Sequence, residues 1–275
     1  MNKIINNIQN KTKYKFFPKN KEELQKIIDS QIHNHGIKVD LNDIDTSKIT
    51  DMSWLFSYYN FNGNISKWDV SNVTDMNSMF TNSKFNQDIS NWDVSNVTDM
   101  SWLFSTSIFN KDISKWNVSN VTNMNSMFSN SKFNQNISNW DVSNVTNMES
   151  MFYSSKFNQD IYKWDVSNVT DLSCMFYASN FNKDISKWNV SNATDMSYMF
   201  SESKFNQDIS NWNVGNVTDM SWLFYRVKFN KSISNWFLNL NKNCNLKCFI
   251  NNKNIKINSY EDFKQYHRKL VLKKL

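Results

Sequence analysis

The chain has 275 residues, of which 40% are hydrophobic and 20% charged, and its formal net charge is +6. With only 3 Gly and 1 Pro, the sequence lacks the glycine-rich and proline-rich linkers that would join separate domains. The 3 cysteines form an odd count outside any repeated pattern, which argues against a disulfide framework.

The positive charge is unevenly distributed along the chain. Residues 1–48 carry 9 basic against 6 acidic side chains, residues 49–238 carry 13 against 17, and residues 239–275 carry 9 against 2. The central region is therefore mildly acidic and cannot form an electrostatic track for phosphates, which makes nucleic acid an unlikely partner. Any attraction to anionic lipid or nucleic acid would fall on the C-terminal segment alone.

No targeting or membrane segment is visible in the sequence. The first residues, MNKIINNIQNKTKYK, contain no apolar run long enough for a signal peptide. No stretch of about 18 apolar residues is present for a transmembrane helix. On these features alone, a cytoplasmic location is expected.

Residues 1–43 are predicted to form an N-terminal cap. Asn20, followed three residues later by Glu23, has the pattern of a helix N-cap, and Gly36 is placed to end the helix. Residues 37–41 alternate apolar and polar side chains, which predicts a strand. One face of the predicted helix is apolar: Leu24, Ile27, Ile28 and Ile32.

The dominant feature is a repeat over residues 44–238. Eight tryptophans are spaced by 24 residues without insertion or deletion: Trp68, Trp92, Trp116, Trp140, Trp164, Trp188, Trp212 and Trp236. The unit FNQDISNWDVSNVTDMSWLFSTSI, residues 85–108, recurs on both sides of itself. A constant short period predicts a solenoid in which each coil buries its apolar side chains against its neighbours. Of the 21 Phe, 16 fall in two columns of this repeat, as a stacked core requires.

Within a unit, the apolar pattern predicts two short elements. Trp92 and Val94 point inward from a short strand centred on residues 92–94. Thr98 or Asp99 would cap one or two helical turns, whose inward side chains are Met100, Leu103 and Phe104. The predicted fold is an α/β repeat solenoid, right-handed, with a parallel β-sheet on one side and short helices on the other.

Residues 239–275 are predicted to be a basic C-terminal cap. Ser259 and Asp262 form a capping pair for a helix that carries Phe263 and Tyr266. The last coil of a solenoid needs such a cover, because its apolar edge would otherwise be open to water.

Polar columns of the repeat are interpreted as structural. One asparagine column follows the second Phe column, and another lies four residues after each tryptophan; both are expected to form amide ladders between coils. The residue after each tryptophan exchanges Asp for Asn: Asp69, Asp93, Asn117, Asp141, Asp165, Asn189 and Asn213. Because an amide cannot act as a general acid, base or nucleophile, no catalytic residue is expected here.

No metal or cofactor is expected either. His33, His35 and His267 all lie in the caps, so the repeat offers no triad and no zinc cluster. Cys244 and Cys248 have no matching second ligand pair.

Two variable columns carry large aromatic side chains, which are common in interface hot spots. A structural alternative is that these rings lie over neighbouring turns and seal the core. The candidate binding residues are Trp54, Trp102, Tyr198, Trp222, Tyr153, Tyr177 and Tyr225.

The units F-N-x-D-I-S-x-W-D-V-S-N-V-T-D-M resemble those of the BspA-type leucine-rich-repeat surface proteins of bacteria, over about residues 44–238. This resemblance implies a leucine-rich-repeat-like solenoid, a role in adhesion or protein–protein interaction, and a location at the cell surface or outside the cell. The expected function is a non-enzymatic module that binds a protein or glycan partner. The alternative is tethering to anionic lipid or nucleic acid through residues 239–275, with the solenoid as a spacer. The identity of the partner and the oligomeric state stay open at this point.

Overall fold

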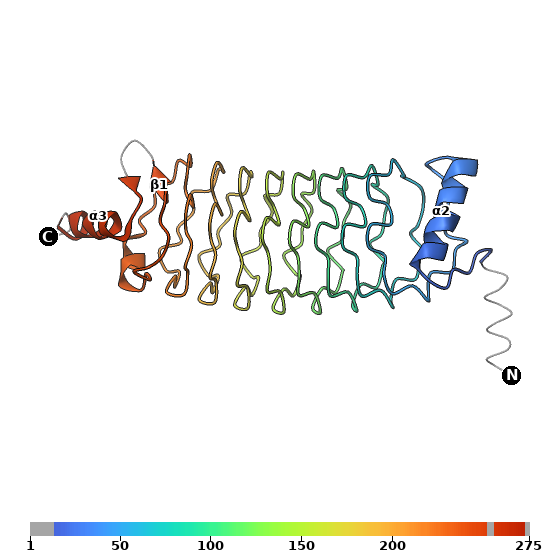
Figure 1. Cartoon of the computed structure of the whole chain (residues 1–275), viewed down its shortest axis with the longest axis horizontal. Coiled ribbons are helices and arrows are strands. Elements are labelled where there is room, and N and C mark those ends of the chain that lie inside the picture. Colours follow the sequence, from blue (N-terminus) through green and yellow to red (C-terminus); the bar gives the residue numbers. More distant parts are fainter. Residues whose placement is uncertain (1–13, 252–255, 273–275) are drawn as a thin grey trace.

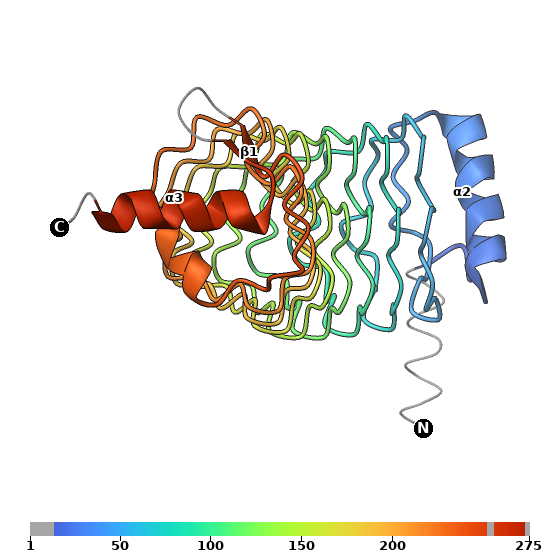
Figure 2. The same cartoon turned by 60° about the vertical axis from the view of Figure 1, so that its left-hand side comes forward.

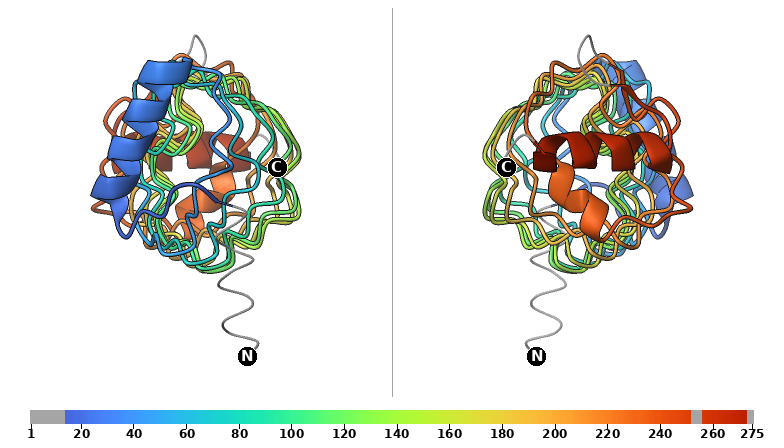
Figure 3. Two further views of the ribbon diagram at one scale, coloured as in Figure 1. Left: turned by 90° about the vertical axis from the view of Figure 1, so that its right-hand side faces the viewer. Right: turned by 90° about the vertical axis from the view of Figure 1, so that its left-hand side faces the viewer.

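The computed structural model describes residues 14–251 and 256–272. They form a stack of similar coils between the helices α2 (Lys21–His35) and α3 (Tyr260–Leu272) (Figure 1). Viewed along the stack, the coils lie almost over one another (Figure 3). This confirms the repeat architecture, whereas the handedness of the stack stays a prediction. Residues 1–13, which are most of the segment considered for a signal peptide, and residues 252–255 and 273–275 of the basic segment lie outside the described residues.

The core repeats the same buried side chains in every coil. The tryptophans of the repeat are at most 4% exposed, as predicted. The Trp92 indole N–H donates to the carbonyl of Ile65 at 3.2 Å, and the other seven tryptophans repeat this bond across 27 residues. The two Phe columns stack along the axis and on each other, with 5.5 Å between the ring centroids of Phe80 and Phe104 and 4.4 Å between those of Phe80 and Phe85. Each coil therefore completes the core of its neighbours.

The strand predicted around Trp92 is not formed. The chain there makes tight turns, in which Trp92 N–H donates to the Ile89 carbonyl and Val97 N–H to the Val94 carbonyl. The Asp93 carboxylate accepts the Ser95 N–H at 3.1 Å. Side chains of this kind compete for backbone N–H groups and favour turns over strands. Among the described residues, the only strands are β1 (Ile250–Asn251) and β2 (Lys256–Ile257), an antiparallel pair near the C-terminus.

The short helix predicted after Thr98 is also absent, and its place is taken by a structure that we call the turn ladder. Trp102 N–H donates to the Asn125 carbonyl of the next coil at 2.8 Å, and Met100 N–H donates to the Asn123 carbonyl at 3.0 Å. Trp102 and Thr106 have φ of 59° and 55°, in the left-handed region. In a helix, an N–H donates to the carbonyl four residues earlier in the same segment, whereas here alternate N–H groups donate to the next coil.

The turn ladder recurs in every coil along the stack. An isolated parallel bridge joins each coil to the next, from Asp51–Asp75 to Asp219–Asn245. Thr98 caps no helix; its hydroxyl donates to the Thr74 carbonyl of the preceding coil at 3.2 Å. Hydrogen bonds between coils thus replace the sheet that the sequence predicted.

α2 covers the first coil as predicted. The Asn20 side chain accepts the Glu23 N–H at 2.9 Å, and Gly36, with φ of 83°, ends the helix. Leu24 and Ile28 are fully buried against the stack.

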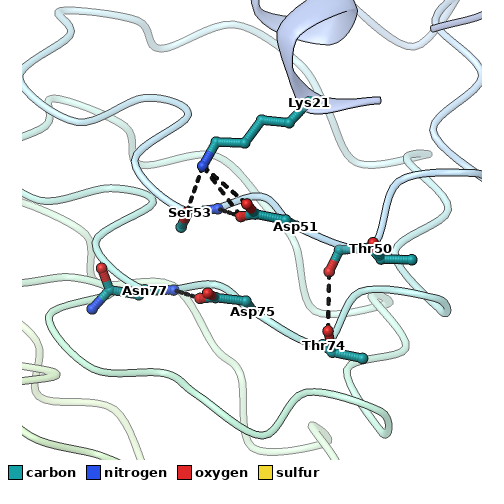
Figure 4. A network of polar contacts seen from close by, with 7 residues as sticks. All are labelled: Lys21, Thr50, Asp51, Ser53, Thr74, Asp75 and Asn77. Atoms are coloured by element: carbon teal, nitrogen blue, oxygen red, sulfur yellow. Dashed lines mark hydrogen bonds and ion pairs between the residues drawn. The ribbon is translucent and has the colours of Figure 1, made fainter. Parts of the chain in front are cut away.

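The segment after α2 does not form the predicted strand at 37–41 and makes only one bridge, between Asp40 and Asn64. Lys21 of α2 reaches the Asp51 carboxylate and the Ser53 hydroxyl of the first coil (Figure 4). Coil edge and helix are therefore joined by polar as well as apolar contacts.

α3 lies across the other end of the stack, close to the 3-10 helix η1 (Ser234–Leu238) (Figure 2). Ser259 accepts the Asp262 N–H at 3.2 Å, which confirms the predicted capping pair. Phe263 is buried, and His267 Nδ1 lies 3.0 Å from the Ser234 carbonyl oxygen. The tethering role considered for residues 239–275 stays a prediction. Within the described residues, no helix is both long and apolar enough to cross a bilayer.

Candidate binding surface

The turn ladder places two residues of every coil in the left-handed region of φ. One column has φ between 54° and 63°: Trp54, Ser78, Trp102, Ser126, Ser150, Cys174, Tyr198 and Trp222. The other has φ between 50° and 61°: Tyr58, Asn82, Thr106, Asn130, Ser154, Ala178, Glu202 and Arg226. For a bulky side chain this conformation is costly. We infer that the hydrogen bonds between coils offset the cost, because the N–H groups of the first column, and of the second as far as Glu202, donate to the next coil.

Five of the predicted candidate residues lie together and form what we call the aromatic strip. Tyr153 stacks on Tyr177 with 4.8 Å between ring centroids, and Tyr177 lies 6.3 Å from Tyr198 in the next coil. Tyr198 stacks on Trp222 at 5.7 Å, and Trp222 meets Tyr225 edge to face at 4.6 Å. All five side chains are half-buried. The strip thus joins rings from four successive coils into one continuous surface.

The other two candidates stand apart from the strip. Trp54 is 54% exposed and Trp102 is 44% exposed, and Ser78 separates them in their column. Neither makes a ring contact with any described residue. Tyr58, which is 70% exposed, was missed by the sequence analysis. Tyr58 belongs to a third variable column of the repeat, and this variability was the signal that could have identified it.

Cys174 lies between the rings of the strip in sequence but is not a reactive thiol. Burial raises the pKa of Cys174 to about 11, and the charge of Glu149 adds to the increase. Burial also raises the pKa of Tyr177, with a further contribution from Glu202. At neutral pH the thiol therefore carries its proton, and a thiolate nucleophile is not available.

The asparagine columns form ladders, as predicted. Asn86 N–H donates to the Asn62 side-chain carbonyl at 2.9 Å, and the same bond recurs along the column up to Asn230. In the second column, the Asn96 amide donates to the Ser71 carbonyl at 2.7 Å, and its counterparts do likewise. These amides are used in holding the coils together.

An acidic column follows the bridges of the turn ladder. Burial raises the pKa of Asp75, and the negative charges of Asp51 and Asp99 raise it further. Asn occupies the same column at 123, 147 and 245, and the Asn123 amide donates to the Asp99 carboxylate at 3.2 Å. Each member also accepts the N–H two residues on, as Asp75 does from Asn77 at 2.7 Å (Figure 4). Hydrogen bonding rather than charge is the shared property of this column.

Comparison with known families identifies the repeat. Residues 24–132, 105–179 and 154–262 match the family model described as "Mycoplasma protein of unknown function, DUF285". These overlapping matches extend over the whole array of coils. The chain belongs to this family. DUF285 is a family of BspA-like tandem repeats. No curated protein and no solved structure matches the chain.

Within the described residues, no group of three or more His, Cys, Asp or Glu side chains is arranged to hold a metal ion. Cys244 is buried, and burial raises its pKa to about 12. Five of the seven predicted aromatic candidates are grouped in the aromatic strip, and Trp54 and Trp102 lie apart from it.

Proposed function

We propose that this chain is a non-enzymatic interaction module that binds a protein or glycan partner through the aromatic strip. The proposal extends to an adhesive role of the kind implied by the resemblance to BspA-type leucine-rich-repeat surface proteins. Its support is the repeat surface together with the distribution of aromatic side chains on it.

The observation that carries the proposal is the continuity of the strip. Before Tyr153, serine occupies most positions of the columns to which Trp222 and Tyr225 belong. These serines are Ser78, Ser126 and Ser150 in the first column, and Ser57, Ser105 and Ser129 in the second. Serine therefore satisfies the needs of the coil, and aromatic rings are not required for folding at these positions. Half-buried Tyr and Trp side chains bring large contact areas with little loss of conformational freedom on binding.

The chemistry of the ionisable groups supports a binding role over an enzymatic one. The carboxylates of the coils accept backbone N–H groups of their own turns, as Asp99 does from Ser101 at 2.7 Å. A raised pKa keeps the thiols of Cys174 and Cys244 protonated.

The test uses the serines of the array as a guide. In one variant, the strip residues Tyr153, Tyr177, Tyr198, Trp222 and Tyr225 are replaced by serine. In the control variant, Trp54 and Trp102 are replaced by serine. Both are measured against immobilised panels of oligosaccharides and of extracellular proteins, after circular dichroism has shown that the fold is retained.

The strip variant is expected to lose binding at least about tenfold, since each lost ring removes more than about 1 kcal/mol at a hot spot. The control variant is expected to bind as the parent does. Equal binding by parent and strip variant, or no binding of the parent to any probe, would overturn the proposal.

A further inference from the structure

A polar cavity opens beside one end of the aromatic strip. It has a volume of about 450 Å³ and is lined in part by Lys204, Arg226 and Lys228, together with Asn182 and Asn206. No carboxylate is among its lining residues. Three cations thus line one cavity on a chain whose coils are otherwise mildly acidic.

The cations are available for a ligand. Lys204 and Lys228 occupy the same position in successive coils, are both exposed, and form no ion pair with any described residue. Arg226 contacts the Glu202 carboxylate through a single nitrogen, at 3.2 Å. Because a guanidinium has five N–H donors, Arg226 retains donors for a second anion.

Arg226 links the cavity to the strip, although no strip residue lines the cavity itself. The Arg226 guanidinium lies over the Tyr225 ring, with 5.1 Å between its central carbon and the ring centroid. Tyr225 in turn contacts Trp222 at 4.6 Å. A ligand whose anionic group enters the cavity would therefore place its adjacent atoms on aromatic faces.

Asn182 and Asn206, which line the cavity, indicate which groups a ligand could present there. The side-chain carbonyl of Asn182 accepts the Asn206 N–H, and that of Asn206 accepts the Asn230 N–H. The amide nitrogens of Asn182 and Asn206 donate to no described residue, so they can bind hydroxyl groups. The volume lies within the range of small-molecule sites.

We propose that this cavity binds the carboxylate or sulfate group of an acidic saccharide, with the sugar ring packed on Tyr225 and Trp222. The proposal rests on the proposed function and names the class of its partner. Cations supply the charge, amides bind the hydroxyls, and the rings accept the apolar face of the sugar. Poly-glutamate, as an acidic peptide, supplies the negative charge but has neither a sugar ring nor sugar hydroxyls.

The experiment titrates the full chain with oligogalacturonate, with its neutral methyl ester, with a sulfated oligosaccharide and with poly-glutamate, by calorimetry. The test variant is K204Q/R226Q/K228Q. The matched control is K132Q/K156Q, which removes lysines from the same column in other coils. A further variant, E202Q, removes the carboxylate that competes for Arg226.

The oligogalacturonate, the sulfated oligosaccharide or both are expected to bind the parent chain. The test variant and the methyl ester are each expected to weaken this binding at least about tenfold. The control is expected to change it less than about twofold, and E202Q to tighten it by about twofold to threefold.

Equal binding of acid and ester, equal losses in test and control variants, tighter binding of poly-glutamate, or no binding at all would overturn the inference. The proposed function fails separately. If the serine variant of the strip abolishes binding to another probe that K204Q/R226Q/K228Q leaves unchanged, the strip functions without an acidic saccharide.

Discussion

The Lys21 ammonium nitrogen lies 3.2 Å from both carboxylate oxygens of Asp51, and this contact fastens α2 to the first coil of the turn ladder. N–H groups of the ladder donate toward the C-terminal end, so the first coil has no earlier coil to donate to it. The helix α2 occupies the position that an earlier coil would have. Its lysine donates to the side chains of Asp51 and Ser53 at the edge of the first coil.

Replacing Lys21 by Met should lower the free energy of unfolding by about 1 kcal/mol, because the pair is partly exposed. Burial raises the pKa of Asp51, but hydrogen bonds from Ser53 and Lys21 lower it below its ordinary value. Asp51 therefore stabilises the fold above its unfolded pKa of about 3.9, and this contribution is lost as the pH falls through the lower folded pKa.

Urea unfolding of the parent and of K21M between pH 2 and pH 7 measures both effects. K21M should lose part of the dependence on pH below about pH 4. The control is K48M, which removes an exposed lysine without an ion pair in the described structure. A similar loss of stability in K48M would contradict the role given to Lys21.

Replacing Asp75 by Asn should stabilise the protein at neutral pH by about 0.5 to 1 kcal/mol. The folded pKa of Asp75 is raised by burial and by neighbouring carboxylates, so its ionised form is less favourable in the folded state. The penalty is full above the raised folded pKa, decreases as the pH falls through it, and is gone below the unfolded pKa. An amide at 75 can also donate to Asp51, as Asn123 does to Asp99.

Thermal unfolding of D75N at pH 7 and pH 3 tests this prediction. The gain should be present at pH 7 and absent at pH 3. D93N is the matched control, because side-chain and backbone hydrogen bonds from Ser95 lower the pKa of the exposed Asp93. D93N should not stabilise the protein at neutral pH. Stabilisation by both variants alike would argue against an electrostatic origin.

Replacing Trp140 by Phe should cost about 2 to 3 kcal/mol, since it leaves a cavity and removes a buried hydrogen bond. The Trp140 indole N–H donates to the Ile113 carbonyl at 3.1 Å, and that carbonyl keeps only the Trp116 N–H afterwards. The same substitution at Trp102, which is 44% exposed, should change stability by less than about 0.5 kcal/mol. Denaturant unfolding of both variants decides whether burial separates the two tryptophans.

Trp140 and Trp102 also show which features of the fold could be predicted from the sequence and which could not. The burial of Trp140 and the stacking of coils follow from its 24-residue period alone. The conformation of Trp102, with φ of 59°, does not, because glycine usually marks such positions and none occurs in either left-handed column. It depends on hydrogen bonds between residues in different coils. The short helix was predicted wrongly for this reason, and the short strand because local turns such as that of Asp93 and Ser95 take its place.

The candidate residues were found as large aromatic side chains in two variable columns of the repeat, but their grouping was not predicted. Tyr177 and Tyr198 belong to different columns and meet because the next coil brings one column beside the other. Which residues of the two columns meet depends on how the turn ladder positions one coil on the next. Lys204, Arg226 and Lys228 escaped notice for the same reason, since only the structure places them around one cavity.

The left-handed column offers a further prediction at Ser154, which is exposed and has φ of 50°. Replacement by Gly should raise the free energy of unfolding by at most about 1 kcal/mol, because relief of strain exceeds the greater entropy of an unfolded glycine. Replacement by Val should lower it by about 1 to 2 kcal/mol, because a β-branched residue tolerates this conformation poorly. Chemical denaturation of both variants measures the difference. A more stable valine variant would show that strain is not stored at this position.

Removing two whole coils should leave a folded protein. Deletion of residues 69–116 joins Trp68 to Asn117 and keeps both caps, the aromatic strip and the register of every column. Each coil contacts only its neighbours, so the new junction restores the same Phe stacking and the same ladder. Cooperative unfolding should persist, and its dependence on urea should fall by about one sixth, in proportion to the surface removed.

The control deletes residues 69–104, which is one and a half coils. The tryptophans after the junction then no longer align with Trp68 and instead face turn positions of the neighbouring coil. That variant should lose the cooperative transition seen by tryptophan fluorescence. If both deletions unfold cooperatively, strict register between coils is not what holds the stack together.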